Sequence, residues 1–141
     1  MEEPLTEELL NELLSAPDPT TYLNEHHTNT RNLARYLEEL LNERGLKRSD
    51  VVHAAQLDST YGYQLFTGSR SNPSRDKVLQ LAFAMHLSLR ETDRLLQAAG
   101  SSRLYCKDRR DAIVIFCLDR GASLEELNES LYSLGERALS E

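Results

Sequence analysis

Positively charged side chains that could bind a polyanion are concentrated in the middle of the sequence. Residues 44–77 carry a net charge of +3, whereas residues 1–43 carry −8 and residues 78–141 carry −2. Nucleic-acid-binding proteins gather Lys and Arg on one face or stripe, so a basic segment between acidic ones is compatible with that function. A chance fluctuation in a short window explains the same distribution equally well. The position of these charges within a motif must therefore decide between nucleic-acid binding and chance.

The total charge argues against a general binder of polyanions. The 141 residues include 23 acids and 16 bases, which give a net charge of −7. Non-specific affinity for nucleic acids comes mostly from surplus Lys and Arg. A broadly basic binder is excluded, and only weak, salt-sensitive and oriented contact with DNA fits this composition.

Other residue types that do chemistry form no recognisable site. Cys106 and Cys117 lack the spacing of zinc ligands. The adjacent His26 and His27 would point about 100° apart on a helix and would seldom share one metal ion. A Gly-rich phosphate loop, a nucleophile motif and a His–carboxylate cluster are all missing from the sequence. We therefore expect no enzymatic activity, no cofactor and no bound metal.

The sequence also predicts the compartment. Two cysteines without a disulfide pattern fit a reducing environment. The first residues, MEEPLTEELLNELL, are acidic where a signal peptide would be basic, and no apolar run approaches the length of a membrane span. A cytoplasmic protein without a membrane partner is expected.

The elements that must position the basic residues are predicted to be helices. Apolar residues at helical spacing indicate helices from Thr6, over about Thr20 to His26, and from Leu33 to a natural end at Gly45. Ser49 and Ser59 are predicted to cap two short helices, the first through Ala55 and the second through about Thr67.

Three further serines mark helix starts in the second half of the chain. Ser74 is predicted to cap a helix that holds Val78, Leu81, Ala82 and Met85. The stretches Ser88-Leu-Arg-Glu91 and Ser123-Leu-Glu-Glu126 are capping boxes, each followed by apolar residues at helical spacing.

The apolar run Ala112-Ile-Val-Ile-Phe-Cys-Leu118 is ambiguous, because its β-branched residues would also suit a buried strand. No second run of this type exists to pair with it, and an isolated strand would leave its backbone groups unpaired. A fully buried helix is therefore predicted, and the fold class is all-α. A chain of this length with 40% hydrophobic residues can bury a sizeable core.

The segment from Leu33 to Leu95 has the order of elements of a helix-turn-helix, with a short turn at Gln56-Leu57-Asp58. It resembles the phage-repressor, Cro/C1-type (XRE) family. The matching residues are Leu33-Ala-Arg-Tyr-Leu37, Arg44-Gly-Leu46, Val51-Val52, Leu57, Leu65, Gly68, Arg70-Ser-Asn-Pro-Ser74, Leu79, Leu81 and Ala82.

A small bacterial subgroup of this family, which carries a helical C-terminal extension, is also similar. The residues that carry this likeness are Tyr61-Gly-Tyr-Gln-Leu-Phe66, Ser74-Arg-Asp-Lys77, Leu104-Tyr105 and Arg109-Arg-Asp-Ala112. The resemblance implies a helix-turn-helix domain over residues 32–100, an N-terminal helical extension over 1–31 and a C-terminal helical extension over 101–141 that packs on the same core.

The family resemblance also implies which residues would bind DNA. The second short helix would enter the major groove of duplex DNA. Its base-reading residues would be Ser59, Thr60, Tyr63 and Gln64. The phosphate contacts would be Lys47, Arg48, Arg70, Asn72 and Arg75. The four basic residues of this set belong to the basic middle of the chain, which favours a sequence-specific transcriptional regulator that binds DNA as a homodimer.

Two positions depart from the family pattern. Gly62 stands where the family usually has a buried Ile or Val, and we expect it to let two helices approach closely. Gln56 stands at the turn position normally held by Gly, which requires an altered turn if its φ angle is positive.

Two alternatives stay open at this point. The second short helix is aromatic and uncharged, so a protein–protein interaction module on the same scaffold is the alternative function. The C-terminal extension is either a surface for dimerisation or partner docking, or a simple extension of the core.

Overall fold

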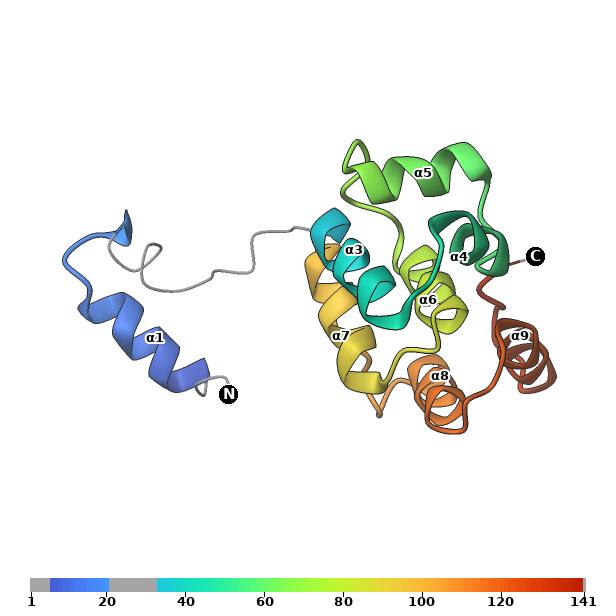
Figure 1. Ribbon diagram of the computed structural model, residues 1–141. Helices are drawn as coiled ribbons and strands as arrows, with labels where there is room; N and C mark the ends of the chain where they lie inside the picture. Colours follow the sequence, from blue (N-terminus) through green and yellow to red (C-terminus); the bar gives the residue numbers. More distant parts are fainter. Residues whose placement is uncertain (1–5, 21–32, 141) are drawn as a thin grey trace. The chain divides into compact units, whose positions relative to one another are not determined.

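The computed structural model describes residues 6–20 and 33–140, and this part of the chain is all-α (Figure 1). These ranges contain eight helices and no strand. The helices are α1 (Thr6–Ser15), α3 (Leu33–Arg44), α4 (Arg48–Ala54), α5 (Ser59–Thr67), α6 (Arg75–Ala84), α7 (Leu89–Ala98), α8 (Arg109–Asp119) and α9 (Leu124–Ser133).

The chain divides into two compact units, Met1–Thr30 and Arg31–Glu141. The first unit contains α1, which begins at Thr6 as the sequence predicts. The helix predicted over about Thr20 to His26 lies almost entirely outside the described residues.

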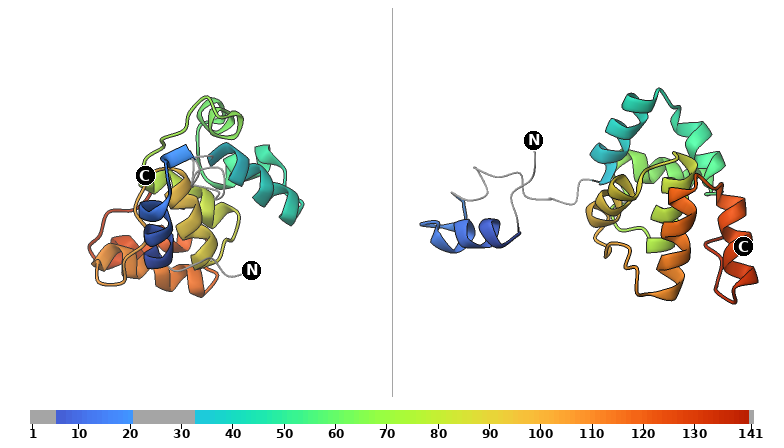
Figure 2. Two further views of the ribbon diagram at one scale, coloured as in Figure 1. Left: turned by 90° about the vertical axis from the view of Figure 1, so that its left-hand side faces the viewer. Right: turned by 90° about the horizontal axis from the view of Figure 1, so that it is seen from below.

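One hydrophobic core runs through α3 to α9. Helix α6 is its centre, because six consecutive residues from Val78 to Phe83 are buried and the helix contacts α4, α7 and α9. Helices α8 and α9 lie side by side and continue this core, to which they contribute Val114, Cys117, Leu127 and Leu131 (Figure 2). Residues on both sides of Gly100 therefore share one core.

Local sequence determines most helix ends. Side-chain oxygens of Ser74, Ser88 and Ser123 accept hydrogen bonds from the amides three residues later, and both predicted capping boxes are confirmed. Two predicted caps are wrong by one or two positions. Helix α4 begins after Lys47, so Ser49 lies inside it without capping it, and Asp58 rather than Ser59 caps α5.

Helix α8 confirms that the apolar run 112–118 is helical, but the prediction of full burial is wrong. Only Asp111, Val114 and Cys117 of this helix are buried, and the Phe116 side chain is 58% exposed. Packing against α7 and α9 covers one stripe of the helix and leaves the opposite stripe uncovered.

The turns after α4 and α6 have the same conformation and both contain a non-glycine residue with positive φ. Gln56 has a φ of 59° and His86 a φ of 53°. In each turn, the next amide bonds to the carbonyl five residues earlier, Leu57 to Val52 and Leu87 to Ala82. This is the Schellman ending, in which glycine is strongly preferred at the positive-φ position.

Replacing His86 by Gly is therefore expected to stabilise the protein by about 1 kcal/mol, because glycine adopts this conformation without the steric penalty of a Cβ atom. Urea unfolding followed by circular dichroism measures the change. The control is Glu38→Gly, placed at an exposed position inside α3, which should destabilise the protein by about 1 kcal/mol. A loss of stability in His86→Gly would contradict the expectation.

Candidate functional site

Helix α5 exposes one polar side to solvent. Ser59, Thr60 and Tyr63 are exposed, and Gln64 is half-buried. The opposite side of the helix is buried through Gly62, Leu65 and Phe66. The Asp58 carboxylate accepts a hydrogen bond from the Tyr61 amide at 3.0 Å and so caps the helix at the end where these polar residues lie. All four predicted base-reading residues thus reach one surface or its edge.

Gly62 allows the close approach of α4 and α5 that the sequence predicts. A Cβ atom at this position would lie 2.5 Å from Cγ1 and 2.6 Å from Cγ2 of Val52 in α4. Carbon atoms in van der Waals contact are about 3.5–4.0 Å apart. Only glycine fits here without a shift of one helix, so this residue sets the distance between α4 and α5.

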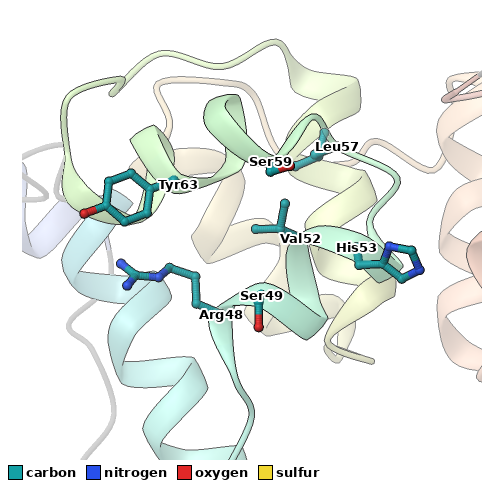
Figure 3. A pocket seen from close by; sticks show the side chains of 7 residues that line it. All are labelled: Arg48, Ser49, Val52, His53, Leu57, Ser59 and Tyr63. Carbon is teal, nitrogen blue, oxygen red and sulfur yellow. The ribbon is translucent and has the colours of Figure 1, made fainter.

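Two of the predicted phosphate-contacting residues lie beside α5 and touch it. The Arg48 guanidinium lies over the Tyr63 ring, 4.7 Å from its centroid (Figure 3). Arg70 follows the helix, and its Nε donates a hydrogen bond to Gln64 Oε1 at 2.5 Å. Both arginines are exposed, as are Lys47 and Asn72. Each of these two arginines is held against a residue that the sequence assigns to base reading.

Arg75 is placed differently from the other four. Its guanidinium forms a two-pronged ion pair with Asp111 at 2.7 and 2.8 Å. It also donates to the carbonyl oxygens of Ser102 and Arg103. The hydrogen-bonding groups of Arg75 are therefore used within the protein and are not available to a phosphate.

Tyr61 and Lys77 belong to the same surface, although sequence reasoning gave them no role there. The Tyr61 ring lies under two cations, 5.1 Å from Arg70 and 4.1 Å from the Lys77 ammonium. Burial raises the pKa of the Tyr61 phenol, and the positive charge of Arg70 opposes this rise. The phenol remains neutral near pH 7 and can donate a hydrogen bond. No local spacing signals this pair, because a loop separates the two residues in the sequence.

A pocket of about 510 Å³ lies between α4 and α5 (Figure 3). Its lining consists of Arg48, Ser49, Val52, His53, Leu57, Ser59 and Tyr63. A cation and hydroxyl groups therefore line it together with the aliphatic side chains of Val52 and Leu57. The pocket thus belongs to the surface that carries Arg48, Ser59 and Tyr63.

Two features are absent from residues 6–20 and 33–140. These ranges hold no group of three or more His, Cys, Asp or Glu side chains that could bind a metal ion. They also hold no helix that is both long and apolar enough to cross a membrane.

The chain has no match among protein-family models, curated proteins or solved structures. Function is therefore inferred from the surface around α5.

Proposed function

We propose that this protein is a cytoplasmic, non-catalytic transcriptional regulator that binds duplex DNA without a cofactor. In this proposal α4 and α5 form a phage-repressor-like helix-turn-helix, and α5 enters the major groove. The observation that carries the proposal is the exposed polar half of α5 with cations on both sides of it, Arg48 before and Arg70 after. Positive charge beside an exposed helix N-terminus is the usual arrangement for contact with the DNA backbone.

Base reading is assigned mainly to Gln64. Its carboxamide can accept from N6 and donate to N7 of adenine, which is the pairing that identifies this base in the major groove. In the free protein Gln64 Oε1 accepts from Arg70. Because this oxygen has a second lone pair, Gln64 can accept from adenine while Arg70 stays in place or after Arg70 has moved to a DNA phosphate, which is the partner proposed for it. The hydroxyl groups of Ser59 and Thr60 can form hydrogen bonds with several different bases, and Tyr63 can contact a thymine methyl group.

The charges outside α5 orient the protein on DNA. Arg48, Arg70 and Lys77 contact side chains of α5, and Lys47 precedes Arg48 in the chain, while the chain as a whole carries a net charge of −7. A small basic surface on an acidic protein attracts DNA in one orientation and repels it in the others. The proposed homodimer would place two copies of α5 about 34 Å apart, which matches one turn of DNA.

Substitutions on this surface test the proposal. Sites selected from random duplex DNA at low salt provide the probe, and fluorescence anisotropy measures the affinity. Gln64→Ala is expected to weaken binding about 10- to 100-fold at the selected site and to relax the preference for adenine there. Arg48→Ala should weaken binding to all sequences and reduce the slope of log K against log salt by about 1.

The controls are Gln97→Ala and Arg90→Ala, both at exposed positions of α7, and neither should change binding. If wild type binds no duplex at low salt, DNA binding is excluded and the protein-interaction alternative replaces it. If the controls weaken binding as much as Gln64→Ala, α5 is not the contact surface.

A further inference from the structure

The last residues that the structure describes form a tethered segment without regular secondary structure. We call residues 136–140 the C-terminal segment. The amide of Glu136 donates to Leu131 at 2.8 Å, and the carbonyl oxygens of Arg137 and Ala138 accept from Arg110 at 2.8 and 3.2 Å. A segment without regular secondary structure usually frays unless hydrogen bonds or packing hold it. Here the bonds fix the path of the segment residue by residue.

The segment ends at the turn between α4 and α5. Asn128 of α9 accepts from the Leu139 amide at 2.8 Å and donates through Nδ2 to Ser140 Oγ at 2.9 Å. The Ser140 hydroxyl in turn donates to Gln56 Oε1 at 2.8 Å. A chain of hydrogen bonds thus runs from α9 through Ser140 to the turn.

Gln56 is the residue of this turn that most needs support. Its φ of 59° is a conformation that non-glycine residues seldom adopt. On the buried side, Gln80 Nε2 donates to the carbonyl oxygen of Ala55 at 2.8 Å. Ser140 holds the turn from the opposite, exposed side. Asp58, which caps α5, follows two residues later, so the conformation at Gln56 sets the direction in which α5 begins.

We propose that Asn128 and Ser140 are positioning residues for α5, which act by holding Gln56 in its positive-φ conformation. The C-terminal extension then does more than enlarge the core, because its last residues set the geometry of the surface that α5 presents. The part of this proposal that concerns DNA rests on the proposed function. Its effect on the turn itself does not depend on any ligand.

Hydrogen exchange at single residues tests the effect on the turn. The amides of Gln56 and Leu57 bond to His53 and Val52 and report its opening. In Ser140→Ala we expect these two amides to exchange about two- to tenfold faster, the range for the loss of one hydrogen bond. The matched control is Ser133→Ala, because the Ser133 hydroxyl bonds only within α9, to the Glu129 carbonyl.

Asn128→Asp gives a second variant that keeps the acceptor for the Leu139 amide. Its carboxylate would compete with Gln56 for the single Ser140 hydroxyl proton, so the same two amides should exchange faster. Equal acceleration throughout α3 to α9 would mean that the segment adds only general stability, which overturns the proposal. Unchanged exchange at Gln56 and Leu57 in Ser140→Ala also overturns it.

A double substitution tests the coupling to Gln56. Gln56→Gly removes the side-chain acceptor, and it also removes the steric penalty of the positive φ angle. Adding Ser140→Ala to Gln56→Gly should therefore leave the exchange of the Leu57 amide unchanged. Full acceleration in that background would show that Ser140 acts through another contact.

DNA binding provides the last measurement. Ser140→Ala should weaken affinity for the selected site about two- to tenfold and leave the salt slope unchanged, since no phosphate contact is lost. An unchanged affinity would refute the link between the segment and α5. If wild type binds no DNA, only the proposed function fails, because the exchange experiment still decides whether Ser140 holds the turn.

Discussion

Replacing Gly62 by Ala is expected to destabilise the protein by about 2 kcal/mol, although alanine is the better helix former. The added Cβ atom would lie 2.5 Å from one methyl group of Val52 and 2.6 Å from the other. Because both methyl groups are in the way and a β-branched side chain has few alternative rotamers, rotation of Val52 does not relieve the contact. Helices α4 and α5 must move apart instead. Urea unfolding measures the loss.

A second substitution separates this contact from a general effect of alanine. Val52→Ala removes both methyl groups, so Gly62→Ala should cost much less stability in the Val52→Ala background than in wild type. We expect a coupling energy of about 1–2 kcal/mol between the two positions. If Gly62→Ala is as stable as wild type, or if its cost is the same in both backgrounds, the close approach of the helices does not depend on Gly62.

Arg75→Ala is the second substitution with a large expected effect, a destabilisation of about 2–3 kcal/mol. The substitution removes hydrogen bonds to both oxygens of Asp111 and to two backbone carbonyls. It leaves the Asp111 carboxylate, of which 8% is exposed, without its cation. Removing one partner of a buried ion pair costs about 3–5 kcal/mol, and the 26% exposure of the Arg75 side chain lowers that expectation.

The pH dependence of this effect has a defined sign. Burial by itself would raise the pKa of Asp111, but hydrogen bonds from Arg75 and the Tyr105 amide, and the charges of Arg75 and Arg110, lower it below its usual value. The stabilisation is therefore complete above the pKa of the unfolded state, about 3.9, and is lost as pH falls through the lower folded value. Without Arg75, we expect burial to be the main influence on the Asp111 carboxylate and to raise its pKa. The difference in stability between wild type and Arg75→Ala should therefore become smaller as the pH falls from 7 to 3.

Arg109→Ala is the control for the loss of an arginine nearby. Arg109 pairs with Glu136 at 3.2 Å, but its side chain is 67% exposed, and exposed pairs contribute about 0–1 kcal/mol. If the two arginine variants unfold at the same urea concentration, or if the loss in Arg75→Ala does not depend on pH, the ion pair with Asp111 is not a major source of stability.

Local signals in the sequence predict most of the helices, but they do not determine every cap residue or how much of each helix is buried. A capping box such as Ser88 to Glu91 acts within four residues, so its geometry follows from the sequence alone. The neighbouring cap residues Asp58 and Ser59 are both suitable, and the sequence does not distinguish them. Phe116 illustrates the second limit, because its exposure depends on where α7 and α9 lie.

The candidate site is also predictable from the sequence only in part. The exposure of Ser59, Thr60 and Tyr63 follows from helical periodicity, since the buried Gly62, Leu65 and Phe66 define the opposite side. The pairing of Arg75 with Asp111 joins residues 36 positions apart and depends on the tertiary arrangement that brings the start of α8 to the start of α6. A basic residue next to a predicted DNA surface cannot be assigned to phosphate binding until such internal partners are known.

The hydrogen bond between Arg70 and Gln64 has a consequence for selectivity. It occupies one of the two lone pairs of Gln64 Oε1 before any DNA binds, and so fixes which end of the carboxamide faces Arg70. On the proposed function, the second lone pair and the Nε2 donor stay available for adenine, and another base does not pair with both. A side chain that is oriented in advance loses less conformational freedom on binding, which favours the sequence that matches it.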